Sequence, residues 1–322
     1  MIVKLWCGGE FGLGNANPTK VTGETLQSIE SFLNRASKEL IRANETDIPG
    51  LHARMDKIDA GSSAAKASID IAAYDLLAKR EKKPLYRMLG GENDRMVTDM
   101  TIGICSTEEA VSRALAHQKE GFKALKIKVG LNMEDDVARV DAIRGAVGSG
   151  VELRVDANQG YTVEQAVRFA EEMHSFGVVV IEQPVKAEDI AGLKQVRTSS
   201  QVPIMADECV KSSLDARNIL RAGAADMINI KLMKSAGILD AMMINRLAEG
   251  TGAQTMVGCM GEIQLSIAAG LHFALSSPNI KYADLDSHFN ILGDPSRGLA
   301  FEDGQLVAPS RPGLGISTTM DE

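Results

Sequence analysis

The chain has 322 residues, of which 44% are hydrophobic and 24% charged, as in a globular protein with a sizeable core. Its net charge of −8 argues against nucleic acid or an anionic membrane as a partner. Four scattered cysteines exclude a disulfide framework and a zinc ribbon, and they favour a reducing, cytoplasmic location. We recognise no signal peptide, and no apolar run is long enough to cross a membrane.

The first 92 residues predict a smaller α+β capping domain. Residues 1–18 favour a strand and a turn, and residues 23–43 and 62–80 carry helical patterns. The tail 300–322 contains two prolines and three glycines, and we expect it to run back to this domain. No low-complexity linker follows, so the two domains are expected to pack closely.

From residue 96 onward, short runs of β-forming residues alternate with amphipathic segments of helical length, such as 163–177. Eight strands alternating with seven helices are typical of a parallel barrel rather than an open sheet. We therefore predict an α/β fold with a (β/α)₇β modified TIM barrel over residues 93–299. The strands are expected at 96–104, 124–130, 151–158, 178–184, 202–208, 226–233, 253–260 and 281–287.

Polar residues recur every 24 to 28 residues along the barrel sequence, close to the length of one βα unit. They therefore fall at the same phase of successive units, which is the carboxyl end of each strand. Barrels build their active sites at this end. The series consists of Lys128, Asp156, Glu182, Asp207 and Lys231.

The three acids of this series predict a metal site. Asp156, Glu182 and Asp207 end consecutive strands, so their charges would crowd together unless a cation lies among them. Oxygen ligands alone select a hard cation, which indicates one Mg²⁺ ion, with Mn²⁺ as a substitute. Asn158 faces the same side as Asp156, where it either orients the site or forms a turn.

The lysines predict acid–base chemistry. Lys126 and Lys128 share the inward face of one strand, and a desolvated lysine beside another cation becomes a base near neutral pH. Lys231 ends a strand on the far side of the three acids. Two such groups allow removal of the α-proton of a carboxylate from one face and its return to the other, through an enediolate. The sequence therefore indicates a racemase or epimerase with Lys128 and Lys231 as the catalytic pair.

Five motifs together resemble the enolase superfamily, muconate-cycloisomerase subgroup. They are KIK at 126–128, DAN at 156–158, IEQP at 181–184, ADE at 206–208 and NIKLMKSAGI at 229–238. The segment 68–91 is similar to that family's connection from cap to barrel. The resemblance implies a cap over the barrel, one Mg²⁺ ion and assembly as a homo-oligomer. It also implies that Lys126 tunes Lys128 and meets the substrate carboxylate.

The last predicted strand indicates which class of substrate the site binds. Asp284 and Asp286 lie on one face of ADLDSHF, and two further acids in an acidic site call for a cationic group such as an α-ammonium. This pair, and Glu262 in MVGCMGEI, resemble the dipeptide epimerase branch of the family. The expected substrate is an L-Ala-X dipeptide, above all L-Ala-D/L-Glu. Thr101 either lines the pocket or is a buried strand residue.

Two departures from the family pattern leave alternatives open. Family members carry a longer N-terminal segment with a mobile loop, so this chain is expected to open at the second cap strand and to have a cap truncated at its start. Asn15 stands where the family commonly has Glu. The alternatives are a cycloisomerase or o-succinylbenzoate synthase with the same metal and lysines, and a catalytically impaired metal-binding barrel without its lid.

Overall fold

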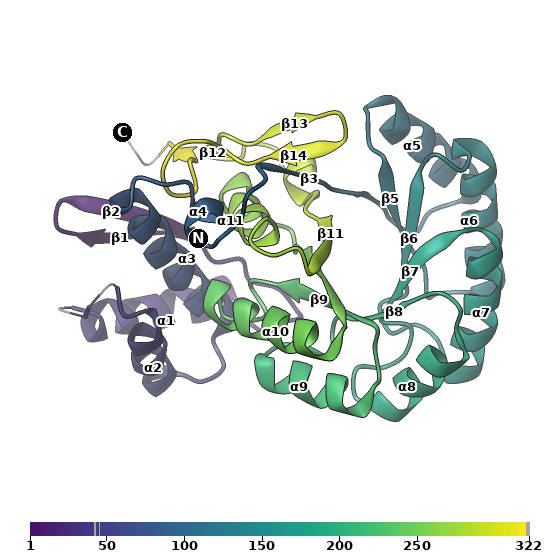
Figure 1. The fold of residues 1–322 in the computed structure, drawn as a ribbon, viewed down its shortest axis with the longest axis horizontal. Coiled ribbons are helices and arrows are strands. Elements are labelled where there is room, and N and C mark those ends of the chain that lie inside the picture. Colours follow the sequence, from purple (N-terminus) through teal and green to yellow (C-terminus); the bar gives the residue numbers. More distant parts are fainter. Residues whose placement is uncertain (42, 45, 320–322) are drawn as a thin grey trace.

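A barrel of eight parallel strands dominates the computed structural model, which describes residues 1–41, 43–44 and 46–319 (Figure 1). The strands lie in chain order from β4 to β11, and a helix follows each of the first seven. The predicted (β/α)₇β fold is therefore confirmed. The strands are β4 (Met100–Ile102), β5 (Ala124–Lys128), β6 (Glu152–Asp156), β7 (Val178–Glu182), β8 (Ile204–Ala206), β9 (Met227–Lys231), β10 (Gln254–Gly258) and β11 (Ile280–Asp284).

Seven helices surround this barrel (Figure 1). Most begin at a side chain that accepts a hydrogen bond from the first turn, as Ser106, Asn132, Thr162 and Ser212 do. The helices are α5 (Thr107–Lys119), α6 (Met133–Val147), α7 (Val163–Ser175), α8 (Ile190–Ser199), α9 (Ser213–Ala222), α10 (Ile238–Thr251) and α11 (Gln264–Ala274).

The barrel closes between its first and last strands through a short seam. The prediction of one continuous strand over 96–104 was wrong: β3 (Arg95–Val97) pairs with β14 (Gln305–Val307) outside the barrel, and only β4 joins the barrel sheet. Between them, Thr98 and Asp99 are fully buried and turn the chain inward. The Asp99 amide donates to Ala283 O at 3.3 Å, and Leu285 N donates to Thr98 Oγ1 at 3.0 Å.

Below the strand ends, the interior of the barrel is mostly apolar, apart from the buried Arg154, which is paired with Val180 in the sheet. Val180, Met205, Met227 and Met256 form a buried cluster of their own inside the strands. Alternate residues on each strand point inward. Two residues farther toward the carboxyl ends, beyond Val180, Met205 and Met227, the inward positions are therefore Glu182, Asp207 and Asn229. This arrangement confines water-accessible chemistry to one end of the barrel.

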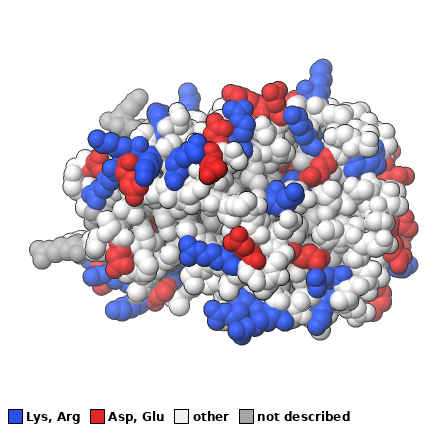
Figure 2. Space-filling view, in the orientation of Figure 1, with Lys and Arg blue, Asp and Glu red and all other residues white. Residues whose placement is uncertain are grey.

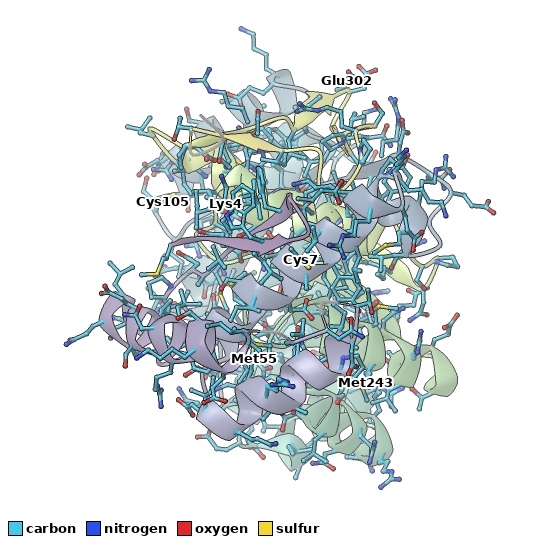
Figure 3. The ribbon with its side chains drawn as sticks, turned by 90° about the vertical axis from the view of Figure 1, so that its left-hand side faces the viewer. Lys4, Cys7, Met55, Cys105, Met243 and Glu302 are labelled. Atoms are coloured by element: carbon cyan, nitrogen blue, oxygen red, sulfur yellow. The ribbon has the colours of Figure 1, made fainter. Side chains whose placement is uncertain are left out.

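A hairpin and four helices form the cap beside the barrel (Figure 1; Figure 3 views the molecule from the cap side). The predicted strand and turn at the start of the chain is an antiparallel hairpin, and the two predicted helices correspond to α1 and α3. A Cβ atom on Gly12 would lie 1.8 Å from Ala72 O, so only glycine lets β2 pack directly on α3. The elements are β1 (Ile2–Cys7), β2 (Glu10–Asn15), α1 (Leu26–Glu39), α2 (Ile48–Ile58), α3 (Ser63–Arg80) and α4 (Leu85–Met88).

The C-terminal segment contacts both parts of the molecule. Strands β13 (Ala300–Glu302) and β14 pair with each other and with β3, and β12 (Ser296–Arg297) pairs with β15 (Ser317–Thr318). Farther on, Leu314 N donates to Asp75 Oδ1 of α3 at 2.7 Å. The domain boundaries at 92 and 299 stay a prediction.

The surface carries mixed charge. On the face shown in Figure 2, basic and acidic side chains are interspersed, apart from one group of basic side chains at its lower edge. None of the helices in the described part of the chain combines the length and the apolar character needed to cross a bilayer.

His272 of α11 links the barrel to the cap and to the C-terminal segment. It is fully buried, and its Nδ1 accepts a hydrogen bond from Tyr86 N at 3.0 Å. Its Nε2 lies 3.1 Å from Leu314 O and donates to it. The contact with Tyr86 N requires an unprotonated Nδ1 and therefore a neutral ring, and burial lowers the pKa of His272 to about 4.

We therefore expect acid to destabilise the fold through His272. The pKa is lower in the folded state, so the stabilisation is complete above about pH 6.5 and is lost as pH falls toward 4. In this pH range, the uptake of one proton lowers the free energy of unfolding by about 1.4 kcal/mol per pH unit. Urea unfolding at about pH 7 and pH 4.5 should show a smaller decrease in the free energy of unfolding for His272→Gln than for wild type. Exposed His174→Gln is the control, and equal decreases in all three proteins would contradict the assignment.

Candidate active site

Six strand ends bring their polar side chains into one layer. β5, β6, β7, β9 and β11 end at Lys128, Asp156, Glu182, Lys231 and Asp284, and Asp207 follows β8 directly. The ladder pairs Lys128 with Asp156 and Asp156 with Glu182, and it pairs Gly258 with both Lys231 and Asp284. Parallel strands in register therefore place residues from distant parts of the sequence at the same height in the barrel.

Lys128 lies on one side of this layer. Its Nζ donates to Asp156 Oδ2 at 2.7 Å and to Asn158 Oδ1 at 3.0 Å, and 29% of its side chain is exposed. Asn158 has a left-handed backbone (φ +41°), and its side-chain Nδ2 donates to Glu208 Oε1 at 3.1 Å. Asn158 therefore both forms a turn and orients Lys128, so the two alternatives that the sequence left open for this residue are compatible.

Lys126 lies beneath Lys128 and is almost completely buried. Its Nζ contacts Glu182 Oε2 at 2.7 Å, Asp284 Oδ2 at 2.8 Å and Asp156 Oδ2 at 3.0 Å. Burial alone would lower the pKa of Lys126, but these carboxylates raise it well above the ordinary value. Lys126 is therefore a permanent positive charge in the floor of the site.

Lys231 lies on the opposite side, beyond strands β6, β7 and β8. Its Nζ donates to Asp207 Oδ2 at 2.8 Å. A second lysine, Lys234, contacts Asp207 Oδ1 and donates to Asp207 O at 2.5 Å. Burial opposes ionisation of Asp207, yet the two lysines hold the pKa of Asp207 well below its usual range.

Three residues of this site escaped the sequence argument. Lys234 follows Lys231 by three residues, and a second lysine in the apolar stretch NIKLMK was the available signal. Asn229 and Arg154 each stand two residues before a recognised site residue, which places them on the same inward face. Asn229 Nδ2 donates to Glu182 Oε1 at 2.8 Å, and Arg154 Nη1 contacts Asp99 Oδ2 at 2.8 Å.

The strand-end acids fit a hard divalent cation. Asp156, Glu182 and Asp207 offer oxygen atoms only, and Asn229 Oδ1 beside Glu182 is buried without a hydrogen-bond partner. Burial and, less strongly, the neighbouring Asp156 raise the pKa of Glu182 to about 7. In this structure, lysine ammonium groups lie against these acids.

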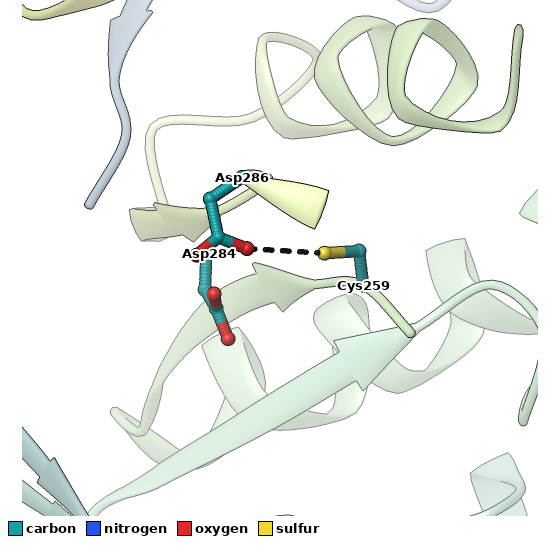
Figure 4. A group of neighbouring side chains, drawn as sticks. All are labelled: Cys259, Asp284 and Asp286. Carbon is teal, nitrogen blue, oxygen red and sulfur yellow. Dashed lines mark hydrogen bonds between the residues drawn. The ribbon is translucent and has the colours of Figure 1, made fainter. Parts of the chain in front are cut away.

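Asp284 and Asp286 lie together with Cys259 at the end of β11 (Figure 4). Asp284 is already paired with Lys126, whereas Asp286 makes no ion pair with any residue that the structure describes. Its Oδ2 accepts a hydrogen bond from Thr101 N at 2.7 Å, and the Cys259 thiol lies 3.7 Å from its Oδ1. Burial and the nearby Asp284 raise the pKa of Asp286.

Thr101 and Glu262 frame this corner. Thr101 binds Asp286 through its backbone N–H group. Glu262 is buried, not open at the barrel mouth, and its Oε1 accepts a hydrogen bond from Met260 N at 2.8 Å. Burial raises the pKa of Glu262 to about 7. Their contact with substrate stays a prediction.

Comparisons with known proteins show the family to which the chain belongs. Residues 1–90 match the family described as "Mandelate racemase / muconate lactonizing enzyme, N-terminal domain", and residues 109–322 match "Enolase C-terminal domain-like". A hydrophobic dipeptide epimerase of Enterococcus faecalis is 41% identical over 313 residues, which cover 96% of this chain and 88% of that protein. An L-Ala-D/L-Glu epimerase of Bacillus subtilis is 41% identical over 316 residues, covering 96% and 86% of the two chains.

The solved structures agree as well. The dipeptide epimerase of Enterococcus faecalis, complexed with Mg and the dipeptide L-Leu-L-Tyr, matches with a TM-score of 0.95 and 40% identity. The match covers 98% of this chain and 91% of that one. The resemblance drawn from the motifs is thereby confirmed, and this chain belongs to the enolase superfamily, in the family of mandelate racemase and muconate lactonizing enzyme.

Proposed function

We propose that this chain is a Mg²⁺-dependent dipeptide epimerase that inverts the α-carbon of the C-terminal residue. The observation that carries the proposal is the placement of Lys128 and Lys231 on opposite sides of the carboxylates of β6, β7 and β8. Relatives with dipeptide epimerase activity in their names support it. We also propose a cytoplasmic location and a homo-oligomer.

The two lysines exchange the α-proton. The neutral amine of one lysine removes the proton from its face of the α-carbon, and the ammonium group of the other donates a proton to the opposite face. One lysine must therefore be neutral while the other is protonated, and their roles are reversed for the other epimer. Ion pairs with Asp156 and Asp207 hold the two Nζ atoms in place.

The remaining groups bind and polarise the substrate carboxylate. Asp156, Glu182 and Asp207 would hold Mg²⁺, which stabilises the negative charge that develops on the carboxylate as the proton leaves. The ammonium group of Lys126 adds a fixed positive charge from below. Both effects make the α-proton more acidic, which favours its transfer to a lysine amine.

Asp286 selects a substrate with a free ammonium group. A buried carboxylate without an ion-pair partner among the described residues is unfavourable unless a ligand cation approaches it. The α-ammonium of a dipeptide meets this need. Asp284 lies next to Asp286 in the same corner (Figure 4). Substrates of a cycloisomerase or o-succinylbenzoate synthase lack this group. We therefore favour an L-Ala-X dipeptide, with L-Ala-D/L-Glu as the first to test.

We expect the purified protein with Mg²⁺ in D₂O to incorporate deuterium at the α-carbon of at least one member of a library of L-Ala-L-X dipeptides. Mass spectrometry measures the label, and its strength across the library defines the preferred X. Removal of the metal with EDTA should abolish incorporation and added Mg²⁺ should restore it. Label that persists in EDTA would exclude a metal-dependent reaction, and no label on any dipeptide would argue against the function.

Replacement of either lysine should separate the two half-reactions. We expect Lys128→Ala and Lys231→Ala each to lower epimerisation by about 10²- to 10⁴-fold. Each variant should still exchange the α-proton of the one epimer that faces its remaining lysine. Proton NMR in D₂O, started from each pure epimer, follows both processes. Equal exchange of both epimers in either variant would contradict the two-base arrangement.

Asp286→Asn should weaken turnover of free dipeptides selectively. A hydrogen bond to a charged group contributes about 1.5–3 kcal/mol, so kcat/KM should fall about 10- to 100-fold. The same dipeptide with an acetylated amine is the matched control, because it has no cation to lose and its turnover should not fall. A calorimetric titration with Mg²⁺ checks that the metal site is intact. An equal decrease in kcat/KM for both substrates would contradict a role of Asp286 in binding the ammonium group.

A further inference from the structure

Helix α10 begins directly after the loop that carries Lys231, and it lacks a cap from its own sequence. The residue at its N-cap position is Gly237, which has no side chain to accept the free backbone N–H groups. Other helices of the barrel, such as α9 with Ser212, supply this acceptor themselves. The acceptor for α10 therefore has to come from elsewhere in the molecule.

Asp70 of the cap helix α3 supplies it. Asp70 Oδ1 accepts a hydrogen bond from Ile238 N at 2.5 Å, and Oδ2 accepts one from Leu239 N at 3.4 Å. The carboxylate is buried, and the positive end of the helix dipole favours its charge. A Cβ atom on Gly237 would lie 2.3 Å from Asp70 Cγ, so this approach requires glycine, whose φ here is +116°. Cap and barrel therefore share one helix cap across 168 residues of sequence.

A compact turn joins Lys231 to the start of α10. Lys234 N and Ser235 N donate to Lys231 O at 2.8 and 3.1 Å, and Gly237 N donates to Leu232 O at 2.9 Å. The Ser235 hydroxyl donates to Gly237 O at 3.1 Å. With its backbone groups paired in this way, the turn behaves as one unit. A shift of the first turn of α10 would therefore move Lys231.

The same carboxylate also connects a second cap helix. His52 Nε2 of α2 lies 2.8 Å from Asp70 Oδ2. Beside this contact is a cleft of about 500 Å³ between cap and barrel, lined among others by His52, Lys66, Lys234 and Leu239. Asp70 thus connects the cap and the barrel next to this cleft.

We propose that Asp70 is a positioning residue for Lys231, through which the cap sets the place of one of the two proton-transfer groups. The inference rests on the proposed function for the role of Lys231, but not for the contact itself. Lys128 lies across the barrel on β5 and is held by Asp156 and Asn158, so it is independent of this contact. Loss of Asp70 should therefore affect one half-reaction and spare the other.

Exchange of the α-proton in D₂O tests this asymmetry in the full-length chain. Overall epimerisation cannot reveal it, because the equilibrium constant fixes the ratio of the two directions. Exchange from each pure epimer does reveal it. For Asp70→Ala, we expect exchange of the epimer that faces Lys231 to slow about 10- to 100-fold, as for a small misplacement of a catalytic group. That epimer is the one that loses exchange in Lys231→Ala.

A graded and a matched variant distinguish positioning from general damage. Asp70→Asn keeps an oxygen that can accept from Ile238 N, so it should recover part of the lost exchange. Asp75→Ala is the control, because Asp75 is a buried acid on the same helix that caps Leu13 N and Leu314 N instead. It should destabilise the fold without favouring one epimer. Equal slowing of both epimers in Asp70→Ala would overturn the proposal.

Hydrogen–deuterium exchange of backbone amides provides a readout that does not depend on turnover. Peptides that cover residues 232–240 should exchange faster in Asp70→Ala but not in Asp75→Ala. Unchanged protection in Asp70→Ala would overturn the link between cap and lysine, whatever the activity. A wild-type protein that labels no dipeptide would refute the proposed function, and the amide exchange would still decide whether Asp70 holds this segment.

Discussion

At the carboxyl ends of the barrel strands, buried carboxylates and buried ammonium groups hold one another in the charged state. Lys126 alone contacts three acids, and Asp207 is held between two lysines. A buried ion without a partner is unfavourable by several kcal/mol, so each member of this set depends on the others. The positions of the proton-transfer groups therefore follow from charge balance as much as from backbone geometry.

This balance exists only when the barrel is closed, because its members come from nearly every strand. Few backbone hydrogen bonds join β4 to β11 where the barrel closes, and Thr98 and Asp99 contribute to this seam. Arg154 also stabilises it, because its Nη1 donates to Ala283 O at 2.9 Å. Ala283 directly precedes Asp284 in the site. The seam thus positions the corner where Asp284 and Asp286 lie, so that closure of the fold and the geometry of the substrate corner are linked.

Local periodicity was sufficient to predict the barrel and the residues at its strand ends. It failed at 96–104, where a continuous β-forming run divides between two sheets because Thr98 and Asp99 are needed at the seam. It also missed Asn229, since a single inward polar residue looks the same in sequence whether or not it meets a partner, and it missed Lys234, which lies in the turn beyond the end of β9. The reading of Asp284 as free for the substrate was incomplete for the same reason, as Lys126 lies against it.

The sequence by itself determined where β5 to β11 of the barrel form, which residues end them and which chemistry those residue types allow, because side-chain direction alternates regularly along a strand. Only the tertiary structure decided which charges meet: Lys126 with Asp284, Lys234 with Asp207, and Asp70 with the first turn of α10. Such pairs are separated by up to 168 residues, and nothing in local propensity relates them. They follow from the order of strands around a closed barrel and from the way the cap packs on it.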